Sequence, residues 1–145
     1  QRSEVRSRVT IECVVNTVVM MKNYNDALRT RSRDLATKVV LFTRVLRQRT
    51  RQFSICDQLI RSGTAPGALL TEALFAESRS DLTHKLKLAL KEAAEALFWI
   101  DLVRDSQLDQ SEELQELRDV CNEVVAMLIA SLKTLGKGDT EKRHP

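Results

Sequence analysis

The segment from Ser80 to Arg104 carries the pattern that most restricts how this chain can fold. Its apolar residues recur every three or four positions, which is the spacing of one face of an α-helix. They are Leu82, Leu86, Ala89, Leu90, Ala93, Leu97 and Ile100. Ser78 and Asp81 resemble a capping box at the start of this segment. A helix of this length with such a stripe must pack against other helices, so we expect an all-α fold.

Three more segments show the same apolar period. They are residues 32–49, 53–76 and 111–135. Ser32 and Ser111 are placed to cap two of these helices, and Gly136 is placed to end the last one. Residues 61–67 interrupt the second segment with two glycines and a proline, and propensity alone favours a break or turn there. With short connections, the four helices predict an antiparallel up-down four-helix bundle.

The composition limits the class of protein. The chain has 145 residues, enough for one domain with its own core, and it is 43% hydrophobic and 30% charged. The three cysteines, Cys13, Cys56 and Cys121, are odd in number and far apart, and each has apolar neighbours. This pattern favours buried, reduced thiols over a zinc site. Reduced thiols fit a reducing compartment, so we expect a cytoplasmic protein. No apolar run is long enough for a membrane span, so we expect no membrane contact.

The two ends of the chain differ from its middle. Residues 1–23 include a stretch rich in β-branched side chains, and Met20-Met21 would make a natural start. We therefore expect an N-terminal extension that is either not native or poorly ordered. Residues 24–135 hold the predicted bundle. Residues 136–145 are mostly polar, so we expect a disordered tail.

Charge is distributed unevenly, although the net charge is only +3. Residues 29–51 hold eight basic residues and one acid, a net charge of +7, while residues 101–123 hold eight acids and two basic residues, a net charge of −6. Arginine suits bidentate contact with phosphate. The candidate nucleic-acid contacts are Arg29, Arg31, Arg33, Arg44, Arg47, Arg49 and Arg51. A solvated charged surface is the alternative, and the opposed signs also suit packing between identical subunits.

A second apolar stripe lies on the segment 80–104, formed by Leu88, Trp99 and Leu102. A helix with two apolar sides covers more than one neighbour. We expect these three residues at an interface between subunits of a homo-oligomer. The alternative is that Trp99 packs inside its own bundle.

Motifs for catalysis and metal binding are missing. A di-iron bundle needs two Glu-x-x-His motifs, but His84 is the only histidine before the tail. Cys56 and Cys121 have no histidine nearby in the sequence to activate them as nucleophiles. The glycines of residues 63–67 are not followed by the Gly-Lys-[Ser/Thr] of a phosphate loop. We therefore expect no enzyme, no cofactor and no metal.

Residues 58–73, 76–93 and 96–103 together carry a distinctive motif. It includes Arg61-Ser62-Gly63-Thr64, then Ser78-Arg79-Ser80-Asp81, then a Lys-Leu-x-x-Ala helix that ends near Trp99. The chain resembles the bacterial four helix bundle protein family, also called the ribosomal RNA intervening-sequence protein family, over about residues 24–135. Relatives are similar to the accessory variability protein of diversity-generating retroelements.

This resemblance implies a continuous second helix, kinked rather than ended at Pro66. It also implies a pentamer that binds a reverse transcriptase and RNA or DNA through a basic surface. Two positions depart from the family pattern, since Leu69 and Pro66 stand where asparagine and isoleucine are usual. We expect a non-enzymatic, homo-oligomeric protein that binds nucleic acid or a nucleic-acid enzyme. The alternative is a structural or protein-interaction module with no nucleic-acid role.

Overall fold

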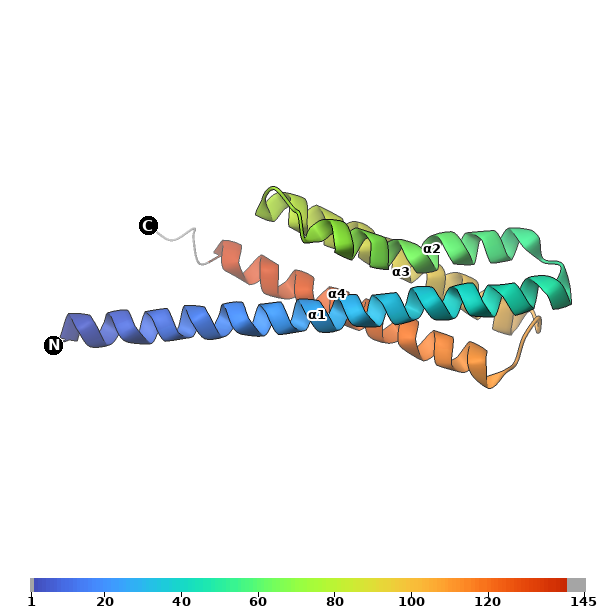
Figure 1. Cartoon of the computed structure of the whole chain (residues 1–145), viewed down its shortest axis with the longest axis horizontal. Coiled ribbons are helices and arrows are strands. Elements are labelled where there is room, and N and C mark those ends of the chain that lie inside the picture. Colours follow the sequence, from blue (N-terminus) through green and yellow to red (C-terminus); the bar gives the residue numbers. More distant parts are fainter. Residues whose placement is uncertain (1, 141–145) are drawn as a thin grey trace.

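The computed structural model describes the backbone of residues 2–140 and the side chains of residues 26–136. Its helices are α1 (Arg2–Thr50), α2 (Phe53–Ala73), α3 (Arg79–Asp105) and α4 (Glu112–Thr140), with no strand among these residues. Each helix packs against the next, and α1 packs against α4 (Figure 1). The predicted all-α, up-down four-helix bundle is confirmed. None of the described helices is long and apolar enough to cross a bilayer.

Helix α1 begins at Arg2, so the prediction that a helix starts at Ser32 is wrong. Ser32 lies in the middle of α1, is fully buried, and its hydroxyl has no hydrogen-bond partner among the described residues. The N-terminal part of α1 projects past the other three helices (Figure 1). The side chains of residues 1–25, Cys13 included, lie outside the described residues, and a separate N-terminal extension at 1–23 stays a prediction.

Helix α2 runs without a break through Pro66 and ends at Ala73. The turn favoured by propensity is therefore wrong, and the continuous helix implied by the family resemblance is confirmed. Figure 1 shows the change of direction midway along α2, as expected where proline removes a backbone donor. Tertiary packing outweighs the local cost, because α1 and α2 touch here. A Cβ atom on Gly63 would lie 2.6 Å from Cγ2 of Val39.

The predicted caps of the last two helices are present. Ser78 accepts a hydrogen bond from the Asp81 backbone N–H at 3.0 Å, and Ser111 accepts one from Leu114 at 3.3 Å. Gly136, in contrast, does not end α4, which continues to Thr140. Residues 141–145 of the predicted tail lie outside the described residues.

The core is formed by the apolar faces that the sequence period indicates. Its fully buried members include Leu35 and Val39 of α1, Leu59 of α2 and Ile100 of α3. Cys56 and Cys121 are buried free thiols, as predicted. Burial raises the pKa of the Cys121 thiol to about 12, which disfavours its thiolate form at neutral pH.

Candidate nucleic-acid interface

The candidate arginines do not form one surface, because α1 directs them along three of its faces. At about 100° per residue, the basic residues fall into three rows, of which the second and third are neighbours only about 40° apart. Arg51 comes directly after α1 and is grouped with the third row by its exposure. The α4-facing row is Arg31, Lys38 and Arg49, the α2-facing row is Arg29 and Arg47, and the outward row is Arg33, Arg44 and Arg51. Each row has different partners.

The α4-facing row pairs with acids of the opposite segment. Arg31 makes a bidentate contact with Glu123, from Nε to Oε2 at 2.6 Å and from Nη2 to Oε1 at 2.9 Å. Its third nitrogen donates to Asp34 at 2.8 Å. Lys38 lies 3.5 Å from a carboxylate oxygen of Glu116. The hydrogen bond from Arg31 lowers the pKa of Glu123. These contacts join α1 to α4.

Arg49 completes the row at the turn before α4. Its Nη1 donates to Oδ2 of Asp109 at 2.7 Å, and the Asp109 side chain is only 3% exposed. Asp109 also accepts hydrogen bonds from the backbone N–H and the hydroxyl of Ser111. Burial raises the pKa of Asp109, but the hydrogen bonds from Ser111 and the Arg49 guanidinium outweigh it, so the pKa lies below its usual value. Arg49 therefore stabilises a buried charge.

The α2-facing row is also paired. Arg29 donates to Asp26 of its own helix at 3.0 Å. Arg47 donates to Asp57 of α2, and its guanidinium lies 5.5 Å from the ring centroid of Phe53. Arg47 thereby joins the end of α1 to the start of α2.

The outward row is different. Arg33, Arg44 and Arg51 are exposed, and no acid among the side chains of residues 26–136 pairs with any of them. Arg51 follows the last residue of α1 and has a left-handed backbone with φ of 56°. The large apolar residues around Arg44 are also exposed. They are Val40, Leu41 and Val45 at 42%, 52% and 51%.

The structure therefore narrows the predicted arginine set. Arg29, Arg31, Arg47 and Arg49 hold the bundle together or pair with a neighbour, whereas the arginines of the outward row have no acidic partner among the side chains of residues 26–136. The helical period of α1 could have sorted the arginines into rows. It could not have shown which row α4 covers.

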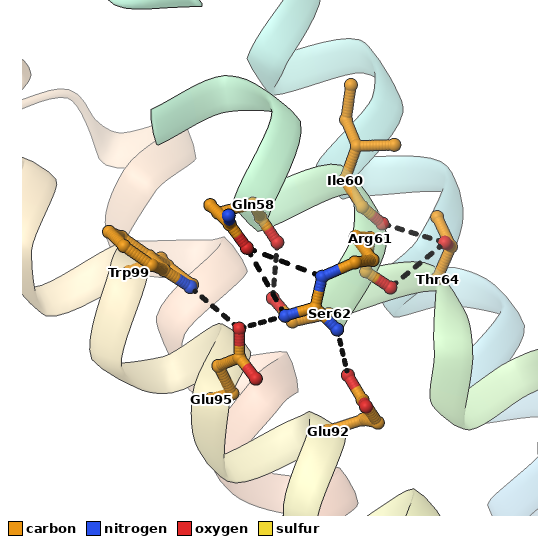
Figure 2. Close-up of polar contacts among 8 residues, drawn as sticks. All are labelled: Gln58, Ile60, Arg61, Ser62, Thr64, Glu92, Glu95 and Trp99. Atoms are coloured by element: carbon orange, nitrogen blue, oxygen red, sulfur yellow. Dashed lines mark hydrogen bonds and ion pairs between the residues drawn. The ribbon is translucent and has the colours of Figure 1, made fainter. Parts of the chain in front are cut away.

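A second polar cluster joins α2 to α3. The spacing of Glu92 and Glu95 on one helix face favours salt bridges from the sequence, and the structure adds their partner, Arg61. Figure 2 shows Arg61 between the two carboxylates of α3, with Nη1 3.1 Å from Glu92 and Nη2 bonded to Glu95. Nitrogens of Arg61 also donate to Gln58 at 3.3 Å. The carboxylates at 92 and 95 lie one turn apart on α3, which gives one guanidinium two acceptors. This cluster is a helix–helix contact.

The predicted subunit interface is only partly exposed. Leu88, Trp99 and Leu102 are half-buried, and Trp99 packs against the core of its own bundle. Its indole donates to Glu95 at 3.2 Å (Figure 2). Phe98, which the sequence prediction left out, is 57% exposed and makes an edge contact with Trp99 at 5.0 Å between ring centroids. An interface formed by these residues stays a prediction.

Among the described residues there is no group of three or more histidine, cysteine or acidic side chains that could hold a metal ion. His84 is exposed on α3, close to Arg79 and Lys87. The charged rows are therefore the features that call for a functional explanation.

Comparisons with known proteins agree with this fold. The model of the family described as 23S rRNA-intervening sequence protein matches residues 27–130. A solved structure of a protein of unknown function, from the S23 ribosomal protein family of Bacteroides thetaiotaomicron, is 30% identical with a TM-score of 0.72. The similarity covers 76% of this chain and 98% of the other. No curated protein matches the chain. The resemblance drawn from the motifs is confirmed, while the link to retroelements stays a prediction.

Proposed function

The chain belongs to the 23S rRNA-intervening sequence protein family, and from this premise we propose that it is a non-enzymatic bundle that binds the nucleic-acid backbone through the outward row of α1. Phosphate contacts from arginine are charge-assisted and bidentate. With 4% aromatic residues, the chain has little material for stacking on bases. We therefore expect binding that is sensitive to salt and tolerant of sequence.

The observation that carries this proposal is that the outward row has no acidic partner within the part of the chain whose side chains are described. The fold places Glu123, Asp109 and Asp57 against the other two rows. The arginines of those rows therefore form ion pairs within the molecule. Arg33 and Arg44 are left exposed about 17 Å apart along the helix axis, and Arg51 is exposed directly after the end of α1. A row of that length can contact several phosphates of one strand.

The experiment measures affinity for an RNA hairpin and a DNA duplex over a range of salt concentrations. The test variant changes Arg33, Arg44 and Arg51 to Gln. The control removes the same number of positive charges from α3, which lies across the bundle from α1. It changes Lys87, Lys91 and Arg104 to Gln. We expect the slope of log K against log salt to fall by about 2–3 for the test variant and by less than about 1 for the control. Equal effects of the two variants, or no binding at low salt, would refute the proposal.

A protein-interaction module is the second candidate, favoured by the exposed Val40, Leu41 and Val45 beside Arg44. Exposed aliphatic residues of this kind suit a protein partner. A nucleic-acid enzyme such as a reverse transcriptase is the partner that the family resemblance suggests. A complex that survives nuclease and high salt, and is lost in Leu41→Ser but not in Arg44→Gln, would favour this candidate over the first.

We also propose that copies of the chain associate through the Phe98, Trp99 and Leu102 side of α3, together with Leu88. The resemblance implies a pentamer. The mass in solution, measured by light scattering, should fall to that of a monomer in Phe98→Lys and stay unchanged in Ile129→Lys, since Ile129 is an exposed apolar residue of α4. A wild-type monomer would contradict the proposal.

A further inference from the structure

Between α1 and α2 lies a polar hollow of about 420 Å³. It adjoins the outward row, because Arg33 lines it. Arg29 and Thr30 line it from α1, and Gly67 and Ala68 line it from α2. Its volume lies within the range of small-ligand sites.

Small residues of α2 create this hollow. Gly67 has no side chain, and a Cβ atom there would lie 3.5 Å from the Ser32 carbonyl oxygen, so the two helices approach closely at its base. Ala68 is exposed at the edge and adds only a methyl group. The space next to the arginines of α1 is therefore open to a ligand.

The hydrogen-bond donors of the hollow come from α1. Arg29 and Arg33 lie one turn apart, which places two guanidinium groups on one side of the space. The Thr30 hydroxyl has no acceptor among the described residues. The hydroxyls of Thr64 and Thr71, across the hollow on α2, donate to backbone carbonyls of their own helix at 2.7 and 2.9 Å. Arg33 and the Thr30 hydroxyl, which have no partner among the described side chains, therefore suit an anion held against α1.

We propose that this hollow seats a backbone phosphate of the bound nucleic acid, an inference that rests on the proposed function. Arg33 and Arg29 bind the phosphate oxygens, and the Thr30 hydroxyl donates a further hydrogen bond. The Asp26 carboxylate, paired with Arg29 at 3.0 Å and lining the same hollow, competes with the phosphate for that arginine. The site thus holds the strand at one fixed point of an otherwise unspecific basic row.

The first test distinguishes a specific phosphate site from non-specific attraction by positive charge. It replaces arginine with lysine, which keeps the charge but cannot form the bidentate contact. Arg33→Lys should lower the affinity for an RNA hairpin about tenfold, the size of a lost charge-assisted contact. Arg44→Lys, outside the hollow, is the matched control and should stay within about twofold of the wild type. Equal affinities of the two lysine variants would overturn the seat.

The second test fills the hollow without changing charge. Ala68→Phe should weaken RNA binding as much as Arg33→Lys, and the two changes together should lose no more than either alone, because both remove one interaction. Ala94→Phe on the exposed side of α3 is the control and should bind as the wild type does. If Ala68→Phe lowers the melting temperature, Thr30→Val replaces it, with a smaller expected loss. Additive losses, or no loss, would overturn the seat.

The third test concerns Asp26. Asp26→Asn should raise RNA affinity several-fold beyond the gain from Asp105→Asn, an equal change of charge on α3. Equal gains in affinity would show that Asp26 does not compete with the phosphate.

Binding of inorganic phosphate distinguishes a site for the free anion from a site for a nucleic-acid strand. If inorganic phosphate binds in the hollow but Ala68→Phe leaves RNA affinity intact, the occupant is free phosphate and the proposal fails. If Arg44→Gln with Arg51→Gln weakens binding while every hollow variant binds normally, the seat fails and the proposed function stands.

Discussion

Arg31 and Arg33 stand two residues apart on one helix, yet they have different surroundings. Arg31 belongs to the α4-facing row and is held by Glu123 and Asp34. Arg33 belongs to the outward row, is exposed, and pairs with no acid of the described residues. The same contrast holds farther along α1 between Arg49, bound to the buried Asp109, and Arg44.

This contrast shows that a basic segment is not by itself a binding surface. Part of the charge of α1 balances the acids of α4, so the opposed charges seen in the sequence meet within one chain. What remains for an external partner is the part that no helix covers. Variants that treat the two rows separately can break or sharpen this distinction.

The largest effect is expected at Arg49. Arg49→Gln leaves the Asp109 carboxylate, 3% exposed, without its cation, and we expect a loss of about 2 kcal/mol in the free energy of unfolding. Arg44→Gln, the matched change in the outward row, should cost less than about 0.5 kcal/mol. Urea unfolding measures both. A similar loss in the two variants would show that the rows do not differ in stability.

Acid should weaken the α4-facing row and leave the outward row unaffected. The pKa values of Asp109 and Glu123 lie below their usual values, so the stability that they contribute is full above about pH 4 to 5 and is lost as pH falls through the folded-state pKa values. The urea midpoint should therefore drop in acid. Asp109→Asn should flatten this dependence, while Arg33→Gln should keep the slope of the wild type. A changed slope in Arg33→Gln would mean that Arg33 has an acidic partner in solution.

Arg51 allows stability and binding to be moved in opposite directions. Its φ of 56° is costly for a side chain with a Cβ atom, so Arg51→Gly should raise the free energy of unfolding by up to about 1 kcal/mol while it lowers RNA affinity. Gln107→Gly, with φ of 58° in the turn after α3, should give the same gain in stability with unchanged affinity. Thermal melts measure the change in stability of each variant, and RNA titrations measure the change in affinity. If Arg51→Gly bound RNA with the affinity of the wild type, Arg51 would not be one of the residues that contact RNA.

The smallest effect is expected from exchanging arginine for lysine in the α4-facing row. Lysine cannot form the fork that Arg31 makes with Glu123. Because this contact is partly exposed, the melting temperature should fall by only about 2 °C. Arg33→Lys should not change it. Differential scanning calorimetry resolves the difference, and an equal shift at the two positions would contradict the assignment of the rows.

The fold could be predicted from the sequence because the apolar residues of each helix recur with the helical period and two helices begin with a recognisable capping residue. Errors arose where distant contacts override local preference. Pro66 stays within α2 because Gly63 packs against Val39 of another helix, which propensity does not register. The rows of α1 are periodic in the sequence, but their partners are separated by up to 92 residues, as for Arg31 and Glu123, so only the assembled bundle shows which charges are used.

The order of packing around the bundle has a consequence for folding kinetics. Each helix meets its neighbour in sequence across a short turn, and only the contact between α1 and α4 joins distant parts of the chain. Contacts of low sequence separation form early, whereas closing a loop of this length carries a higher entropic cost. We therefore expect the ion pairs of the α4-facing row to form after the transition state for folding. Contacts that form this late mainly slow unfolding. The ion pairs of the α4-facing row should therefore set the lifetime of the folded bundle.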